Sequence, residues 1–154
     1  MELILPINVR WNENKILEKK MKTTFLIVLA LFVLTACSNA GEDISGDWTL
    51  VSYGDAASPT PAQPAVDTSI TFADGQMSGN VGCNGFGGNY ELKGDKITFS
   101  GIMSTMMYCE ETSAQEQGVL SVFSDNLALQ FQVSGDSLTI TSADGASVVN
   151  LVHQ

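Results

Sequence analysis

The sequence has very few of the residues that usually carry catalysis or bind metal ions. Its single histidine, His153, stands next to the last residue, where chain ends often fray. A Ser-His-Asp or Cys-His arrangement would need that end folded back into a pocket, and one histidine cannot complete a zinc site. The adjacent acids Glu110 and Glu111 are expected to be solvated in a loop. The sequence therefore predicts a protein that is not an enzyme and holds neither a cofactor nor a metal ion.

Basic residues are scarce as well. The chain has seven Lys and Arg against 17 Asp and Glu, and five of those seven lie in residues 1–36. The remaining 118 residues carry Lys93 and Lys96 against 14 carboxylates, which gives a net charge of −12. Such a surface repels nucleic acid and anionic lipid headgroups. We expect no nucleic-acid partner, and any membrane attachment must come from a lipid.

The sequence also lacks a hydrophobic run long enough to span a bilayer. The apolar stretch from Thr23 to Ala36 has only 14 residues, whereas a spanning helix needs about 20. A basic start at Met21-Lys22, a short apolar run and small residues before Cys37 are typical of a bacterial secretory signal. The ending Leu-Thr-Ala-Cys resembles a lipobox, whose cysteine thiol receives a diacylglyceryl group. We predict a lipoprotein signal peptide at 21–36, with lipidation of Cys37.

This prediction fixes the organisation of the rest of the chain. Residues 1–20 are too long and polar for the start of such a signal, so we expect a misassigned N-terminal extension. Residues 37–45 would form a lipidated tether that spans at most about 30 Å. Two acyl chains on Cys37 would anchor the domain at 46–154 stably to a membrane. We expect it in the cell envelope, at the outer membrane if the cell has two membranes.

Acylation of Cys37 would leave Cys83 and Cys109 as an even pair in an oxidising compartment. Such a pair favours a disulfide, and closing this 26-residue loop would stabilise the fold by roughly 3–4 kcal/mol. Two free core thiols or soft metal ligands are the alternatives. Three methionines precede Cys109 closely, and thioethers prefer Cu(I), so an envelope Cu(I)-binding protein is a further alternative. These methionines are Met103, Met106 and Met107.

Alternation with period two dominates the remaining sequence. Trp48 and Leu50 share one face of a strand, and residues 68–81 are typical of a hairpin that turns at Asp74-Gly75. Further strands are expected within 90–99 and 127–151, separated by short turns. This pattern predicts an antiparallel meander.

One segment instead has a helical period. Ser113 and Glu116 match a capping box, in which both side chains bond the first N–H groups of a helix. Gly118 weakens the helix by about 1 kcal/mol relative to alanine. The apolar positions at helical spacing are Val119, Leu120, Phe123 and Leu127. The predicted fold class is therefore α+β, a mainly antiparallel β-sheet meander with one amphipathic helix at about 113–126.

Several local motifs occur together within residues 46–152. They are Gly46-Asp47-Trp48, Ser78-Gly79, Gly82-Cys83-Asn84, Phe86, Gly88-Asn89-Tyr90, Ser104-Thr105-Met106-Met107, Cys109, Glu116, Phe123, Leu138 and Asp144-Gly145. In this combination the chain resembles the META domain family of HslJ-like heat-shock lipoproteins. It departs from the family at Tyr108, where alanine is usual, and no proline follows Cys109. The resemblance implies a small domain of antiparallel sheet and one helix, linked to stress response and envelope integrity, without an established reaction.

These observations predict a membrane-anchored envelope lipoprotein. Its META/HslJ-like domain would be a non-enzymatic binding or protective module, with a protein partner in the envelope. A lipocalin-like carrier of a small apolar ligand is the alternative, because Gly46-Asp47-Trp48 is similar to the opening of lipocalins and an eight-stranded barrel can hold such a ligand. Against it, a helix interrupts the meander and 118 residues are few for that fold.

Overall fold

Nine strands and one helix make up the computed structural model over the residues that it describes, 43–123 and 125–154. The elements are β1 Gly46–Asp55, β2 Thr60–Pro61, β3 Ser69–Ala73, β4 Gln76–Asn80, β5 Gly85–Lys93, β6 Lys96–Ser104, α2 Ser113–Val122, β7 Ala128–Ser134, β8 Ser137–Thr141 and β9 Ser147–His153. The predicted signal peptide, Cys37 and most of the predicted tether lie outside the described residues.

The hairpins lie where the alternation predicts them. Strands β3 and β4 pair in continuous register from Ser69↔Asn80 to Ala73↔Gln76. The turn residues Asp74 and Gly75 both have positive φ, 50° and 75°. Positive φ at both central positions is what a two-residue type I′ turn requires, and its twist matches that of the flanking strands.

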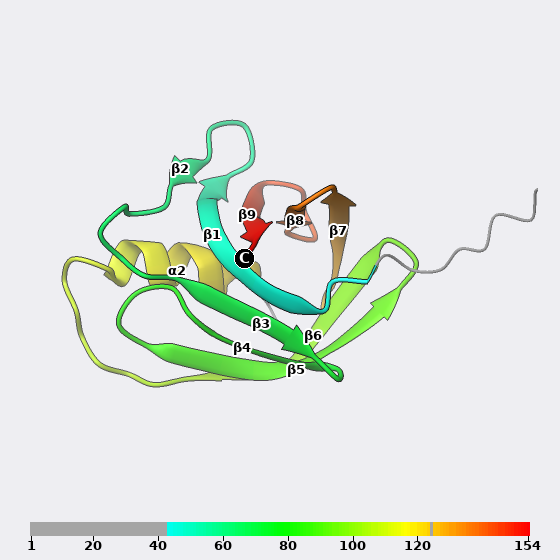
Figure 1. Cartoon of the computed structure of the whole chain (residues 1–154), viewed down its shortest axis with the longest axis horizontal. Coiled ribbons are helices and arrows are strands. Elements are labelled where there is room, and N and C mark those ends of the chain that lie inside the picture. The colour runs from blue at the N-terminus through cyan, green and yellow to red at the C-terminus, as the bar shows by residue number, and fades with distance from the viewer. Residues whose placement is uncertain (1–42, 124) are drawn as a thin grey trace, which may run out of the picture. The chain divides into compact units, whose positions relative to one another are not determined.

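The predicted meander sheet is wrong, because the sheet closes on itself (Figure 1). Strand β9 pairs with β8 on one side and with β1 on the other, so that eight antiparallel strands form a closed barrel. Strand β1 pairs with β3 over Gly46–Trp48 and with β9 over Trp48–Asp55. The two-residue β2 adds to β1. The α+β class is also corrected, since the ten-residue helix is a minor part of a structure that is mostly sheet.

A β-bulge helps β1 to pair with both β3 and β9. The register between β1 and β9 shifts between Leu50 and Ser52, so Val51 is the extra residue, and its side chain is 49% exposed. A bulge bends a strand and increases its twist, which is what barrel closure needs. The described part of these 118 residues is thus enough for eight strands that close into a barrel.

Packed side chains fill the interior. Phe72 on β3, Phe99 on β6 and Phe123 after the helix are almost completely buried, with the ring centroids of Phe99 and Phe123 4.9 Å apart. All three belong to one hydrophobic core with Trp48 and Leu50. Closure meets one requirement of a lipocalin-like carrier, but a carrier also needs an internal cavity. The carrier stays a prediction.

The helix is shorter than predicted. It ends at Val122, and Leu127 lies outside it with 48% of its surface exposed. Asn126 has a positive φ of 59°, which cannot continue a right-handed helix. Within 43–123 and 125–154, no helix has the length and apolar character that a membrane crossing demands.

Gly118 gives the helix its close approach to the barrel. A Cβ atom at this position would lie 2.7 Å from Cε2 of Tyr53 on β1, and closer still to Cδ2. Real Cβ atoms essentially never come this near to another heavy atom, so the helix could not dock as it does with any larger residue. The helix propensity lost at Gly118 is offset by this contact.

We predict that Gly118→Ala destabilises the domain although alanine is the better helix former. Overpacking against Tyr53 should cost about 1–3 kcal/mol, more than the gain of about 1 kcal/mol in propensity. Urea unfolding followed by tryptophan fluorescence measures the difference. The matched control is Gln117→Ala on the exposed side of the same helix, which should stay within about 0.5 kcal/mol of the parent. A Gly118→Ala protein more stable than its parent would contradict the packing argument.

Candidate functional site

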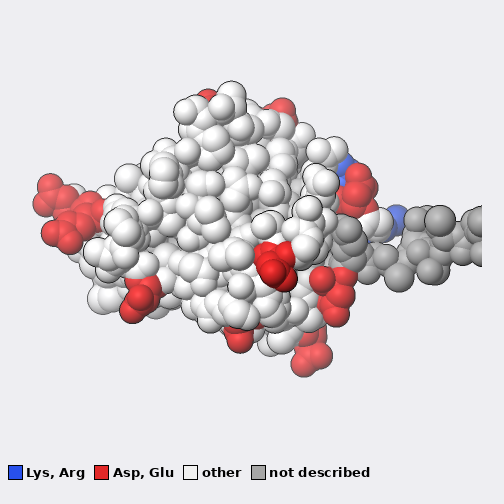
Figure 2. All heavy atoms as spheres, turned by 45° about the horizontal axis from the view of Figure 1, so that its top comes forward, with Lys and Arg blue, Asp and Glu red and all other residues white. Residues whose placement is uncertain are grey.

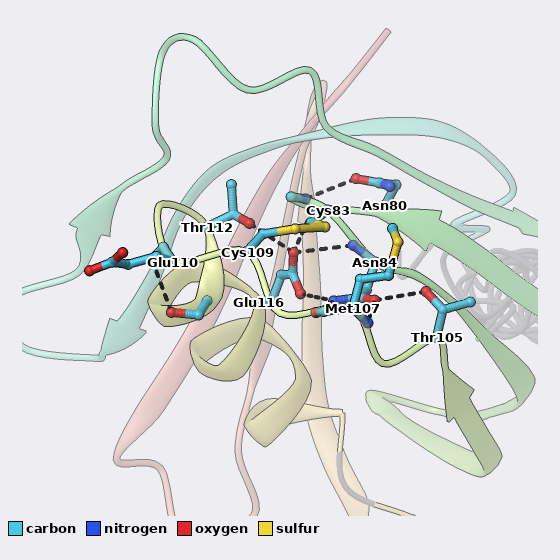
Figure 3. Close-up of a disulfide and its surroundings, with 11 residues drawn as sticks. Asn80, Cys83, Asn84, Thr105, Met107, Cys109, Glu110, Thr112 and Glu116 are labelled. Atoms are coloured by element: carbon cyan, nitrogen blue, oxygen red, sulfur yellow. Dashed lines mark hydrogen bonds between the residues drawn. A yellow bond between two sulfur atoms is a disulfide. The ribbon is translucent and has the colours of Figure 1, made fainter.

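A disulfide joins two loops beside the start of the helix (Figure 3). Cys83 precedes β5 and Cys109 precedes α2, and their Cα atoms are 6.2 Å apart. This bond confirms the predicted pairing, and it excludes free thiols and thiolate metal ligands at these two positions. It holds the loop before β5 against the segment between β6 and the helix.

The carboxylate of Glu116 lies next to this disulfide and accepts four hydrogen bonds. Its Oε1 accepts from the backbone N–H groups of Cys83 and Asn84 and from the Thr112 hydroxyl, the last two at 3.1 and 3.0 Å. Its Oε2 accepts from Nδ2 of Asn84 at 2.6 Å. The Glu116 side chain is only 8% exposed. None of these donors carries a positive charge, so N–H and O–H dipoles hold the carboxylate.

The predicted capping box is therefore wrong. The helix N-cap is Thr112, which makes no side-chain capping bond, and the Ser113 hydroxyl donates to the Glu110 carbonyl at 3.2 Å. Glu116 accepts from the backbone of the Cys83 loop, and at the helix start it accepts from the Thr112 hydroxyl rather than from a backbone N–H group. Gly82 leaves room for it, because a Cβ atom there would collide with Oε1 of Glu116.

Two opposing effects set the pKa of Glu116. Burial disfavours the charged form and raises the pKa, while hydrogen bonds from Asn84, Cys83 and Thr112 favour the charged form. The hydrogen bonds prevail, so the pKa of Glu116 lies below its ordinary value of 4.5. The side chain is a carboxylate at neutral pH and acts as an acceptor rather than as a proton donor.

Asn84 extends the network to the segment between β6 and the helix. Its Oδ1 accepts from the Thr105 hydroxyl and from the Met107 N–H, both at 2.8 Å. Its Nδ2 donates to the Met107 carbonyl at 2.8 Å as well as to Glu116. The Asn84 amide thus bonds both backbone groups of Met107, as a neighbouring strand would. Among the described residues, no buried side-chain nitrogen or oxygen lacks a hydrogen-bond partner.

Gln115 makes a second connection from the first helical turn. Its side chain is fully buried, and its Nε2 donates to the Val81 carbonyl at 2.6 Å. Its Oε1 accepts from the Gln63 N–H at 2.8 Å. The helix start is therefore bonded both to the segment between β2 and β3 and to the segment before Cys83.

The segment held by Asn84 presents large apolar side chains to solvent. We call these the methionine surface: Met103, Met106, Met107 and Tyr108, which are 77%, 95%, 61% and 83% exposed. A pocket of about 290 Å³ adjoins it, lined among others by Asn84, Tyr108 and Leu120. Neighbouring exposed side chains of this size are typical of interaction sites rather than of ordinary surface.

Acidic groups stand beside the methionine surface. Glu110 and Glu111 directly follow Cys109 and are exposed, and Figure 3 shows Glu110 pointing away from the disulfide. Figure 2 shows acidic side chains at several separate places on one face of the domain. The loop acids are solvated, as predicted, and they place negative charge at one end of the apolar segment.

Other predicted residues lie apart from this site. His153 is exposed but not frayed, because its N–H donates to the Asp136 carbonyl at 2.8 Å and its ring packs on Trp48 with centroids 5.0 Å apart. Over residues 43–123 and 125–154, no group of three or more His, Cys, Asp or Glu side chains could hold a metal ion. The Cu(I) alternative, which depends on methionines, stays a prediction. So does the expectation that the protein is no enzyme and needs no cofactor.

Sequence reasoning missed the roles of Glu116 and Gln115. Glu116 was expected to serve its own helix, and nothing in the spacing indicated a partner more than 30 residues away. The signal that could have found it is the small residue Gly82 beside Cys83-Asn84, where close approach of another chain segment is expected.

Comparisons with known proteins support the fold. A model of the META domain matches residues 42–154. The chain is similar to an NMR structure of a protein from Burkholderia xenovorans, with 18% identity, a TM-score of 0.59, and coverage of 71% of this chain and 82% of that one. It is also similar to the crystal structure of a DUF4847 family protein from Bacteroides vulgatus, with 16% identity, a TM-score of 0.52, and coverage of 71% and 93%. No curated protein matches the sequence. At these identities the structural likeness shows the fold alone.

We predict that Glu116→Gln destabilises the domain by about 1.5–3 kcal/mol. All four partners of Glu116 are donors, whereas an amide offers one acceptor oxygen and places an NH₂ group against a donor. Chemical unfolding at pH 7 measures the loss. The control Glu110→Gln, on an exposed acid of the adjoining loop, should change stability by less than about 0.5 kcal/mol.

The pH dependence of stability distinguishes loss of the Glu116 charge from a general packing defect in the Glu116→Gln variant. Because the folded pKa of Glu116 is depressed, its contribution is fully present above 4.5 and is lost as the pH falls through the folded value. The stability difference between parent and Glu116→Gln should therefore shrink on acidification. A difference that stays constant from pH 7 to pH 3 would contradict the assigned role.

Proposed function

The chain belongs to the META domain family, and we propose that it works as a non-enzymatic binding module of the cell envelope. The proposal includes a lipid anchor at Cys37 and a role in stress tolerance and envelope integrity. The links with stress and the envelope come from the family resemblance. The observation that carries the binding role is the exposure of the methionine surface on a segment that buried groups hold in place.

The methionine surface is stabilised through its backbone rather than through its side chains. Asn84 bonds both backbone groups of Met107, and the disulfide fixes Cys109 two residues later. The side chains of Met106 and Tyr108 remain almost fully exposed. A flexible thioether adapts to varied apolar partners, and an aromatic ring adds a large contact area. A fixed backbone reduces the entropy cost of binding.

Charge indicates the chemistry of the partner. The domain carries 14 carboxylates against two lysines from residue 37 onward, and Glu110 and Glu111 stand beside the methionine surface. A complementary partner would place an apolar side chain on the methionines and Lys or Arg near the two glutamates. We therefore propose a protein segment of the envelope with a basic and apolar surface as the occupant. Anionic lipid would be repelled.

The lipid anchor is tested with the full chain expressed in its bacterial host. Acylation of Cys37 predicts that the protein is found in the membrane fraction and that its intact mass corresponds to a diacylglyceryl-modified chain beginning at this residue. Cys37→Ser should release the protein from the membrane fraction. An unmodified chain that still carries Met21 would contradict the anchor.

The partner surface is tested by a photo-crosslinking amino acid placed at Met106 in the full chain within cells. We expect a crosslinked protein adduct there, weakened in membranes washed with high salt because screening reduces charge complementarity. The matched control is the same probe at Val51, an exposed apolar residue of β1. Equal crosslinking at both positions, or a lipid adduct at Met106, would contradict the proposal.

A further inference from the structure

The methionines of the described chain fall into two environments. Met77 on β4 is buried, with 1% of its surface exposed. Met103, Met106 and Met107 lie within five residues of one another and are 77%, 95% and 61% exposed. Three accessible thioethers are therefore concentrated on one short segment, while the fourth contributes to the core.

The fold at this segment does not depend on the methionine side chains. The Thr105 N–H donates to the Gly85 carbonyl at 3.0 Å, and Asn84 bonds the backbone of Met107 on both sides. These bonds use backbone atoms and the side chains of Asn84 and Thr105. A chemical change at the methionine sulfur atoms leaves every one of them in place.

We propose that Met103, Met106 and Met107 form a site of reversible oxidation by peroxide. A sulfur lone pair attacks one oxygen of hydrogen peroxide, an S–O bond forms and the O–O bond breaks. The departing hydroxide takes the proton of the transferred oxygen and leaves as water. Sulfur is oxidised by two electrons to the sulfoxide, and peroxide is reduced by the same two. Methionine sulfoxide reductases reverse the change.

The other sulfur atoms of the described residues do not compete for the oxidant. Cys83 and Cys109 are already bonded to each other, so neither offers a thiolate. Met77 is reached only when the barrel opens locally, which keeps the concentration of its reactive form low. The exposed methionines thus take up oxidant before the core is damaged.

Oxidation would also change the character of the methionine surface. A sulfoxide is polar, so three of them would convert an apolar patch into a polar one. This consequence rests on the proposed function: partner binding at the methionine surface would be switched off by peroxide and restored by reduction. The oxidation site itself does not depend on any partner.

The test treats the purified full chain with hydrogen peroxide and follows each methionine by peptide mass mapping. We expect Met103, Met106 and Met107 to form sulfoxides at least about tenfold faster than Met77, since only Met77 needs local opening. The urea midpoint should be unchanged after the three have reacted, and reductases for both sulfoxide epimers should restore the original mass. Oxidation of Met77 at a similar rate, or a lowered midpoint with Met77 still reduced, would overturn the proposal.

Two variants complete the experiment. Replacing all three surface methionines by leucine should leave slow sulfoxide formation at Met77 as the only oxidation in the folded domain. In contrast, Met77→Leu should leave the rates of sulfoxide formation at the three surface methionines unchanged. Peptide mass mapping needs no binding partner, so its result on the oxidation site remains valid if crosslinking at Met106 fails. If crosslinking at position 106 succeeds, a probe-carrying protein with Met103→Leu and Met107→Leu should keep its adduct under peroxide, while the probe-carrying protein that retains Met103 and Met107 loses it. Loss of the adduct from both proteins would overturn the switch.

Discussion

The carboxylate of Glu116 is the group on which the arrangement of this site depends. It stands in the first part of the helix and binds the backbone of the loop at Cys83-Asn84 together with the Asn84 side chain. Asn84 in turn holds Met107. A buried charge is tolerated only when donors surround it, and here four donors do so. The position of the exposed segment therefore depends on a charge that solvent hardly reaches.

This network also explains why the disulfide and the hydrogen bonds belong together. The disulfide restricts the distance between two loops, but a single covalent link leaves each loop free to rotate. The bonds from Glu116 and Asn84 fix the orientation of the same loops. Covalent and polar constraints thus act on different degrees of freedom, and both converge on the segment from Thr105 to Cys109.

The alternation of apolar residues was sufficient to predict the hairpins, because a turn such as Asp74-Gly75 and its flanking strands are local. Closure of the barrel was not predictable in this way. The same alternation on β1 suits an open sheet and a closed one, and the pairing with β9 joins Ser52 to Asn150, 98 residues away. The same difference between local and long-range features applies to the site. Cysteine count predicted the disulfide, whereas the target of Glu116 depends on a contact between segments far apart in sequence.

The position of β9 between β1 and β8 has a consequence for how the chain matures. Until residues 147–153 are in place, both neighbouring strands expose rows of unpaired backbone groups. Such open edges attract other extended chains. Pairings between distant strands also form slowly, because the intervening chain must first be confined. Before β9 is inserted, the nascent domain is therefore an incomplete sheet that can aggregate through its two open edges.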